Sequence, residues 1–226
     1  MPETISLAIA DGTSMSAYVA RPAAKPSRGL LVFQEAFGVN AHIRDLCHRF
    51  AAQGFLALAP ELYHRSAGDG FEAAYTDFPG VMPHMQALTR EGLDADIRAA
   101  HAWLTAQGVA AVAAAGFCMG GRVAVQAASS VPLAAAASFY GGNLPSLIDR
   151  VPALNAPLLL VWGDRDTHIP RDQRNAFADA CREQQKAFVE CTFSDAGHAF
   201  FCDARPAFHP RSAQLAWPLL LAFLNA

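Results

Sequence analysis

A cysteine stands between glycines in the segment GFCMGG, residues 116–121. Gly116, Cys118 and Gly120 fit the pattern Gly-x-nucleophile-x-Gly, in which a sharp turn between a strand and a helix presents the nucleophile. The glycines lack Cβ, so the strand and the helix can approach closely. A helix N-terminus favours the thiolate, and the backbone N–H of Met119 would face an oxyanion. A cysteine that serves packing alone is the alternative, but three glycines at a predicted strand–helix junction favour a nucleophile.

Two later segments carry groups that could activate this thiol. Asp164 and Asp166 lie in WGDRDTHIP, directly after the apolar run APLLLV, and His198 lies in SDAGHAFF, directly after AFVECTF. A histidine placed there can reach the thiol, and an acid can fix its tautomer. Taken alone, the two acids are better explained by loop solvation and turn capping. The chain order nucleophile, acid, histidine is that of α/β-hydrolases.

The other seven histidines fall on predicted helix faces or loops, where a solvated or hydrogen-bonded structural role is the simpler interpretation; they are at positions 42, 48, 64, 84, 101, 168 and 209. Five cysteines, an odd number without a framework spacing, indicate reduced thiols in a cytoplasmic protein. The start of the chain lacks the basic and long apolar regions of a secretory signal.

The elements that must position these groups alternate along the chain. Two alternating segments around the turn DGT predict an N-terminal hairpin. Apolar runs then predict strands near residues 29–34, 55–60, 109–116, 133–141, 156–164 and 187–195, and amphipathic segments predict helices near 41–54, 93–108, 171–184 and 210–226, with a further helix after the cysteine turn. This alternation predicts a mostly parallel sheet with helices on both faces. In such sheets, function lies in loops beyond the carboxyl ends of the strands.

The composition limits the number of domains and the classes of partner that are plausible. The chain has 226 residues, 53% of them hydrophobic, which suits a single domain over residues 1–226. A net charge of −3 gives no reason to expect a nucleic-acid partner. No stretch is long and apolar enough to cross a bilayer, so no membrane partner is expected. Residues 65–90 are polar and irregular, which is typical of a lid or binding loop.

The whole chain resembles the dienelactone hydrolase family of α/β-hydrolases, on the motifs QEAFGVN, APELYHR, GFCMGGR, WGDRDTHIP and AGHAFF. The resemblance implies an α/β-hydrolase fold, with Cys118 as nucleophile and His198 as base. It also implies that the acid is the Asp that closes the Gly-x-x-Asp segment, which is Asp166 rather than Asp164.

The same resemblance implies roles near the first predicted strand. Glu35 matches the family glutamate that contacts the resting thiol, and Ala36 would supply the second oxyanion N–H. The family also holds a substrate carboxylate with arginines, one of them shortly after the histidine, but Cys202 stands near that place here. Arg205 follows slightly later and is the candidate substitute, and Tyr75 is a candidate for the family tyrosine.

These residues favour a cofactor-free thiol hydrolase that cleaves a small ester or lactone through an acyl-enzyme, as a monomer or small homo-oligomer. The incomplete clamp favours neutral substrates. The alternative is a catalytically weak member that binds a small molecule or partner in the same cleft, and turnover would separate the two. No metal site is expected, because the spacing of His198, Cys202 and His209 is not that of a common site. The glycines also lack the dinucleotide-binding spacing.

Overall fold

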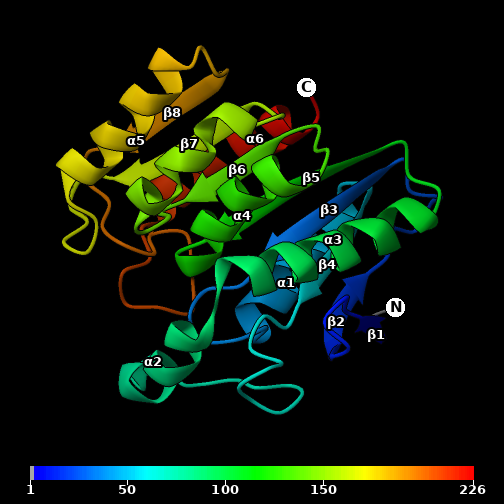
Figure 1. Ribbon diagram of the computed structural model, residues 1–226. Coiled ribbons are helices and arrows are strands. Elements are labelled where there is room, and N and C mark those ends of the chain that lie inside the picture. The colour runs from blue at the N-terminus through cyan, green and yellow to red at the C-terminus, as the bar shows by residue number, and fades with distance from the viewer. Residues whose placement is uncertain (1–2) are drawn as a thin grey trace. The chain divides into compact units, whose positions relative to one another are not determined.

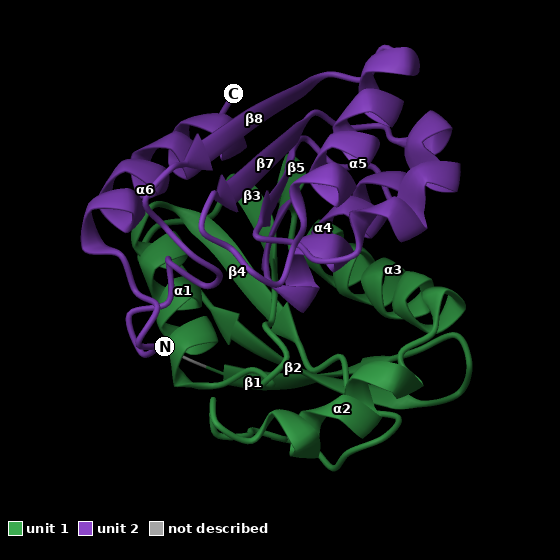
Figure 2. Ribbon diagram, turned by 90° about the vertical axis from the view of Figure 1, so that its left-hand side faces the viewer, with its two compact units in different colours: residues 1–113 green, residues 114–226 purple. Residues whose placement is uncertain are grey.

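The computed structural model describes residues 3–226. The chain divides into two compact units, residues 1–113 and 114–226, coloured separately in Figure 2. Each unit contributes strands and helices in alternation along the chain, as Figure 1 shows by colour. The single domain expected from composition stays a prediction, and the two units are described in turn.

The first unit is built on four strands. The predicted hairpin is confirmed as β1 (Glu3–Ala8) and β2 (Ser14–Ala20), which pair antiparallel. β2 also pairs antiparallel with β4 (Phe55–Pro60), and β4 pairs parallel with β3 (Arg28–Phe33). The strand order is therefore β1-β2-β4-β3, with every residue of β4 buried. A strand buried on both faces needs the continuous apolar sequence FLALAP.

Two amphipathic helices cover this part of the sheet. α1 (Ala41–Ala52) begins at Asn40, whose side chain accepts a hydrogen bond from the N–H of Ile43. α3 (Arg90–Ala106) begins at Thr89, which caps it in the same way. Figure 2 shows α1 and α3 on opposite faces of the strands. The buried residues of α1 include Ile43, Leu46, Cys47 and Phe50.

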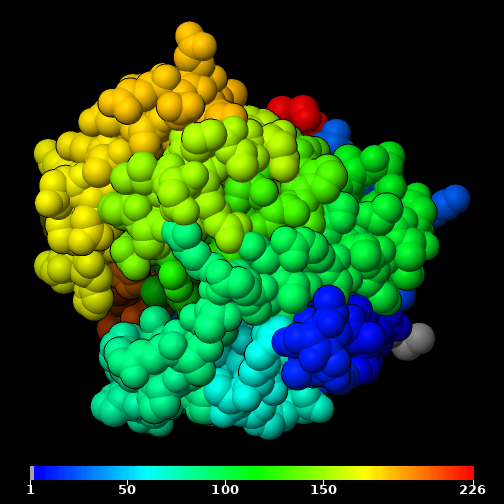
Figure 3. Space-filling model, in the orientation of Figure 1, coloured from blue at the N-terminus to red at the C-terminus, as the bar shows by residue number. Residues whose placement is uncertain are grey.

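The prediction that residues 65–90 are irregular was wrong in part, because the structure has α2 (Phe78–Ala87) there. Asp77 caps this helix, and its side chain accepts a hydrogen bond from the N–H of Gly80. Proline and glycine inside α2 hide the helical pattern in the sequence. Val81 is the buried residue of α2, whereas Phe78 is half-exposed. In Figure 3 this segment, in teal, lies at the surface.

The second unit carries four parallel strands in the order β5-β6-β7-β8. These are β5 (Ala111–Phe117), which belongs to this unit from Ala114 onward, β6 (Ala136–Phe139), β7 (Leu158–Gly163) and β8 (Phe188–Phe193). Since all four run the same way, the loops that follow them share one edge of this unit's sheet. The predicted candidate residues after β5, β7 and β8 therefore lie at that edge.

Helices flank these strands on both faces. Figure 2 shows α6 (Pro210–Leu224) on one face, with α4 (Met119–Ser130) and α5 (Arg171–Glu183) on the other. A 3₁₀ helix, Leu144–Ala153, follows β6 and was not predicted. The turn between α5 and β8, in orange, projects from the surface in Figure 3.

Candidate active site

The turn that carries Cys118 is strained and crowded. Cys118 follows β5, occupies the N-cap position of α4, and has φ of 54° and ψ of −118°. A Cβ on Gly116 would lie 1.9 Å from the carbonyl oxygen of Gly120, and one on Gly121 would lie 2.8 Å from the Cα of Gly141. Larger residues cannot fit at these positions. The glycines therefore let the strand and helix meet while the backbone holds Cys118 in an unfavourable conformation.

The structure places His198 between Cys118 and Asp166. His198 Nε2 lies 3.2 Å from Cys118 Sγ, and His198 Nδ1 lies 2.8 Å from Asp166 Oδ2. The side chain of His198 is 12% exposed and that of Asp166 is 2% exposed. The imidazole is thus fixed at both edges and is largely excluded from water. This is the geometry in which a histidine can take a proton from a thiol while an acid holds its tautomer.

The two candidate acids face different partners. Asp166 Oδ1 accepts hydrogen bonds from the backbone N–H of His168 at 2.7 Å and of Ile169 at 3.2 Å, which leaves Oδ2 for His198. Asp164 instead pairs with Arg171, whose Nη2 lies 2.6 Å from each carboxylate oxygen. The structure therefore places Asp166, and not Asp164, on the histidine.

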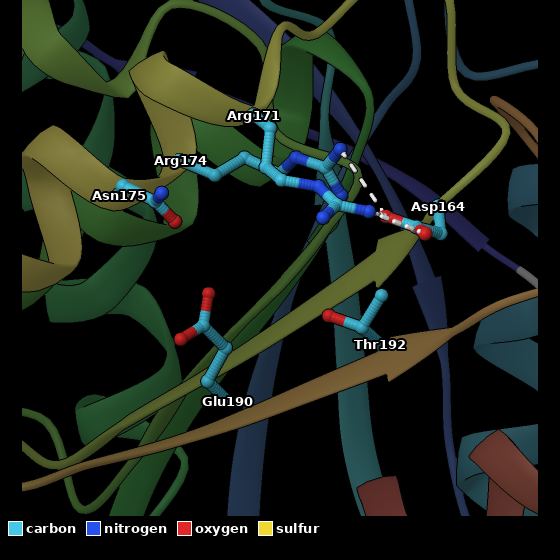
Figure 4. A pocket seen from close by; sticks show the side chains of 6 residues that line it. All are labelled: Asp164, Arg171, Arg174, Asn175, Glu190 and Thr192. Carbon is cyan, nitrogen blue, oxygen red and sulfur yellow. Dashed lines mark hydrogen bonds and ion pairs between the residues drawn. The ribbon is translucent and has the colours of Figure 1, made fainter.

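Asp164 belongs to a separate pocket on the same unit. Figure 4 shows its carboxylate held by two guanidinium groups of α5, and the pocket has a volume of about 310 Å³. Arg174 is buried, donates to the carbonyl oxygen of Gly163 at 3.3 Å, and lies over the ring of Trp162. These contacts fasten the end of β7, directly before the loop that carries Asp166.

The electrostatics favour a charged histidine. Burial alone would lower the pKa of His198, but hydrogen bonds and charge from Asp166 and Cys118 outweigh it and raise the pKa to about 10. Burial would raise the pKa of Asp166, but its hydrogen bond to His198 and the histidine charge lower it overall, with help from two backbone N–H groups. The carboxylate of Asp166 and the sulfur of Cys118 therefore both favour the imidazolium form of His198.

The other cysteines have different surroundings. Cys47 and Cys181 are completely buried, and burial raises the pKa of both thiols, that of Cys181 to about 11. Cys191 is half-buried, and desolvation raises its pKa as well. A high pKa keeps these thiols in the unreactive protonated form. Among residues 3–226, no three His, Cys, Asp or Glu side chains are arranged to hold a metal ion.

Three of the remaining expected residues lie close together in the first unit. Glu35 and Ala36 follow β3 and are buried. Tyr75 packs against this loop, because its ring lies 5.0 Å from that of Phe37 and at 73° to it, and Ala36 belongs to the same apolar cluster. The structure therefore brings Tyr75 to the loop that carries Glu35. Their roles stay predictions.

Met119 and Arg205 lie in the second unit. Met119 is the first residue of α4 and directly follows Cys118. Arg205 is half-buried in the turn after His198, and its backbone N–H donates to the carbonyl oxygen of Cys202 at 3.1 Å. The oxyanion role of Met119 and the substrate role of Arg205 also stay predictions.

Sequence reasoning missed two rings beside the histidine. The imidazole of His168 stacks on that of His198, with centroids 5.0 Å apart and an angle of 15° between the planes. The ring of Tyr140, in a residue with φ of 40°, lies 5.2 Å from His198. The signal for His168 was its position two residues after Asp166. Tyr140 directly follows β6, which was the only signal in its case.

The model of the Dienelactone hydrolase family matches residues 15–226. The chain belongs to this family. It is 36% identical over 230 residues to “Putative carboxymethylenebutenolidase” of Escherichia coli K12, an alignment that covers 95% of this chain and 83% of the relative. A protein with the same name from Azospirillum brasilense is 32% identical and is covered to 97% of its length. The dienelactone hydrolase family is a hydrolase family, so the chain is an enzyme of hydrolase type.

Solved structures confirm the fold class. The crystal structure of “Putative Dienelactone Hydrolase” from Klebsiella pneumoniae matches with a TM-score of 0.89 and 34% identity, covering 100% of this chain and 98% of that one. A Pyrococcus furiosus esterase matches with a TM-score of 0.72 at 15% identity, which shows a shared fold. The predicted α/β-hydrolase fold, with mostly parallel strands and helices, is therefore confirmed. Of the helices in residues 3–226, none has both the length and the apolar character needed to span a membrane.

Proposed function

We propose that this dienelactone hydrolase family member cleaves small carboxylic esters or lactones by covalent catalysis at Cys118. The observation that carries the proposal is the position of His198 between Cys118 Sγ, at 3.2 Å, and Asp166 Oδ2, at 2.8 Å. The strained turn at Cys118 adds support, because it holds the sulfur at a helix N-terminus. The relatives named carboxymethylenebutenolidase favour a lactone as substrate.

In the first half-reaction, the Cys118 thiolate attacks the carbonyl carbon and forms a C–S bond. The backbone N–H of Met119 is a donor for the resulting oxyanion, and that of Ala36 is the proposed second donor. The C–O bond to the leaving group then breaks, and the leaving oxygen takes the proton of the His198 imidazolium. The product at this stage is a thioester of Cys118, with His198 neutral and its Nδ1–H still donated to Asp166.

In the second half-reaction, His198 accepts a proton from a water molecule as the water oxygen attacks the thioester carbon. The C–S bond breaks, the acid is released, and Cys118 leaves as thiolate beside the imidazolium. The thiolate and imidazolium that began the reaction are thereby regenerated. With a lactone, the leaving oxygen stays attached to the acyl chain, so a single hydroxy acid is the product.

Glu35 has a proposed restraining role. A carboxylate beside the sulfur disfavours a second negative charge, so Glu35 would hold the resting thiol less reactive until substrate displaces it. We further propose that neutral substrates are preferred, because the expected arginine clamp is incomplete. Arg205 and Tyr75 are the proposed substrate-binding side chains.

The test is a panel of neutral esters, neutral lactones and carboxylate-bearing lactones, assayed with wild type, Cys118→Ala and Cys181→Ala. The expected result is turnover by wild type and by Cys181→Ala, with none above background in Cys118→Ala. Rapid quenching followed by mass spectrometry should find the acyl group on the peptide that contains Cys118. Full activity in Cys118→Ala contradicts the covalent mechanism. Binding without turnover across the panel would instead support a small-molecule binding module.

Substrate charge is tested with Arg205→Ala. If Arg205 holds a carboxylate, this variant raises KM for carboxylate-bearing lactones and leaves KM for neutral esters unchanged. Fast turnover of anionic lactones that is insensitive to Arg205→Ala would show that the substrate-binding residues lie elsewhere.

A further inference from the structure

The imidazole of His168 covers one face of the proposed base. The two ring centroids lie 5.0 Å apart, and the planes are only 15° from parallel. His168 is exposed to solvent on its outer side, unlike His198, whose side chain is 12% exposed. The sequence alone suggested only a solvated or hydrogen-bonded structural histidine at position 168. The proposed mechanism gives His168 no part in proton transfer or in oxyanion binding.

The turn around Asp166 fixes where His168 lies. The backbone N–H of His168 donates to Asp166 Oδ1 at 2.7 Å, and that of Ile169 donates to the same oxygen at 3.2 Å. The other oxygen, Oδ2, accepts from His198. One carboxylate therefore anchors both the edge of the base and the backbone that carries the stacked ring. The turn therefore places the backbone of His168 where its ring can stack on His198.

A stacked ring restrains a motion that the edge contacts leave open. The contacts of His198 with Cys118 and Asp166 lie at the two ring edges, so the plane of the imidazole can still tilt about the line that joins them. A flat group on the face opposes that tilt. Tyr140 also contacts the ring of His198, with centroids 5.2 Å apart and an angle of 58° between the planes. This contact is tilted, whereas the ring of His168 lies nearly parallel to that of His198.

We propose that His168 is a positioning residue, whose ring face keeps the His198 imidazole aligned between Cys118 and Asp166. The inference rests on the proposed function, because alignment matters only if His198 acts on Cys118. It requires a flat side chain at position 168 and does not require its ring nitrogens. A side chain without a planar ring at position 168 should therefore slow the chemical step, and a different planar ring should restore its rate.

The experiment compares His168→Ala, which removes the face, with His168→Phe, which keeps a face but no ring nitrogen. Thr167→Ala is the matched control, since Thr167 is the exposed neighbour in the same turn. Its Oγ1 lies 3.5 Å from His168 Nδ1, a long contact for a hydrogen bond. Two quantities are measured in each variant: kcat and KM on the best substrate of the panel, and the rate of Cys118 alkylation by iodoacetamide without substrate.

In His168→Ala, kcat and the alkylation rate should each fall about 3–10-fold, the scale of one stacked aromatic contact, while KM stays within about twofold. His168→Phe should lie within about twofold of wild type in both, and Thr167→Ala should match wild type. The proposal is overturned if His168→Ala behaves as wild type, if His168→Phe is as impaired as His168→Ala, or if Thr167→Ala shows the same loss. A rise in KM alone also overturns it, because His168 would then contact substrate. If wild type hydrolyses nothing, the proposed function fails. The alkylation rates then still show whether the ring of His168 positions the His198 imidazole.

Discussion

Each unit of the molecule contains a buried histidine that contacts an aspartate, and only one of the two has the arrangement of a reactive site. In the second unit, His198 Nδ1 lies 2.8 Å from Asp166; in the first, His64 Nε2 lies 3.1 Å from Asp96. His64 and Asp96 are the more deeply buried pair, with side chains 1% and 0% exposed. Burial and a short contact between histidine and acid therefore do not distinguish a base from a structural residue.

The second ring nitrogen makes the difference. His198 presents Nε2 to a thiol, whereas His64 presents Nδ1 to the backbone carbonyl oxygen of Ser14 at 3.1 Å. A thiol can give up a proton and attack a substrate, but a backbone carbonyl oxygen can do neither. The ring of His64 therefore links a strand to a helix, since Ser14 begins β2 and Asp96 lies inside α3.

The two aspartates differ in the same sense. Both oxygens of Asp96 accept hydrogen bonds from the guanidinium of Arg65, at 2.8 and 2.9 Å. Arg65 in turn reaches Asp11 at 2.7 Å, so the cluster joins the hairpin, the segment after β4 and α3. Asp166 instead accepts hydrogen bonds from two backbone N–H groups and lies 2.8 Å from the imidazole of His198. Carboxylates saturated by arginine hold a fold together, while one satisfied by backbone amides can support an imidazolium.

The largest expected effect separates the two histidines by activity. His198→Gln should lower kcat by about 10³–10⁴-fold, because it removes the group that takes the thiol proton. His64→Gln should leave kcat within about threefold of wild type, since it lies outside the proposed site. Steady-state kinetics on the best substrate of the panel measure both. If both variants fold and lose kcat equally, His198 is no more important for catalysis than His64.

The two aspartates should separate by stability. Asp96→Asn leaves Arg65 without its buried carboxylate and should lower the free energy of unfolding by about 2–3 kcal/mol, with activity retained in the folded fraction. Asp166→Asn should instead lower kcat by about 10²–10⁴-fold with a smaller change in stability. Urea unfolding and kcat are measured on the same preparations. A stable Asp96→Asn protein would mean that the Arg65 cluster contributes little to the fold.

The motifs after the strands were predictable because their chemistry imposes residue types. Only a residue without Cβ fits at Gly116, and the positions of Cys118 and His198 follow from strands whose apolar runs are easy to recognise. The choice between Asp164 and Asp166 came from family resemblance, since both are acids in the same loop. The structure supplies a physical reason for it, in that Arg171 occupies Asp164.

The features that were missed depend on contacts between residues distant in sequence or on weak local patterns. Nothing in the chain order places Tyr140 against His198, because that contact arises only when β6, β7 and β8 lie side by side. α2 was missed because Gly80 and Pro83 lie inside a helix that is mostly exposed, so neither propensity nor an apolar stripe revealed it. The network of His64 was likewise invisible, since its partners are separated from it by about thirty or more residues.

A third acid, Glu35, carries the proposed restraining role, and its replacement tests that role. We expect Glu35→Ala to speed the alkylation of Cys118 without substrate by about 3–10-fold, because a negative charge that disfavours thiolate has been removed. Turnover should fall at the same time. Peptide mass mapping of iodoacetamide adducts, with wild type alongside, gives the rate. Slower alkylation would reverse the assignment and make Glu35 the base that generates the thiolate.

The smallest expected effect is on the pH dependence of stability. The pKa of His198 is raised to about 10 in the folded protein, against an ordinary value of 6.5. A raised pKa means that the folded state binds the proton more tightly, so this stabilisation is fully present below about pH 6.5 and is lost as the pH rises through about 10. The stability advantage of wild type over His198→Gln should therefore shrink by at least about 1 kcal/mol between these limits. Asp166→Asn removes the main cause of the raised pKa, so the same histidine should contribute a weaker dependence there. Urea unfolding at closely spaced pH values measures all three proteins, and a wild-type advantage that stays constant up to pH 10 would show that His198 does not carry the charge assigned to it.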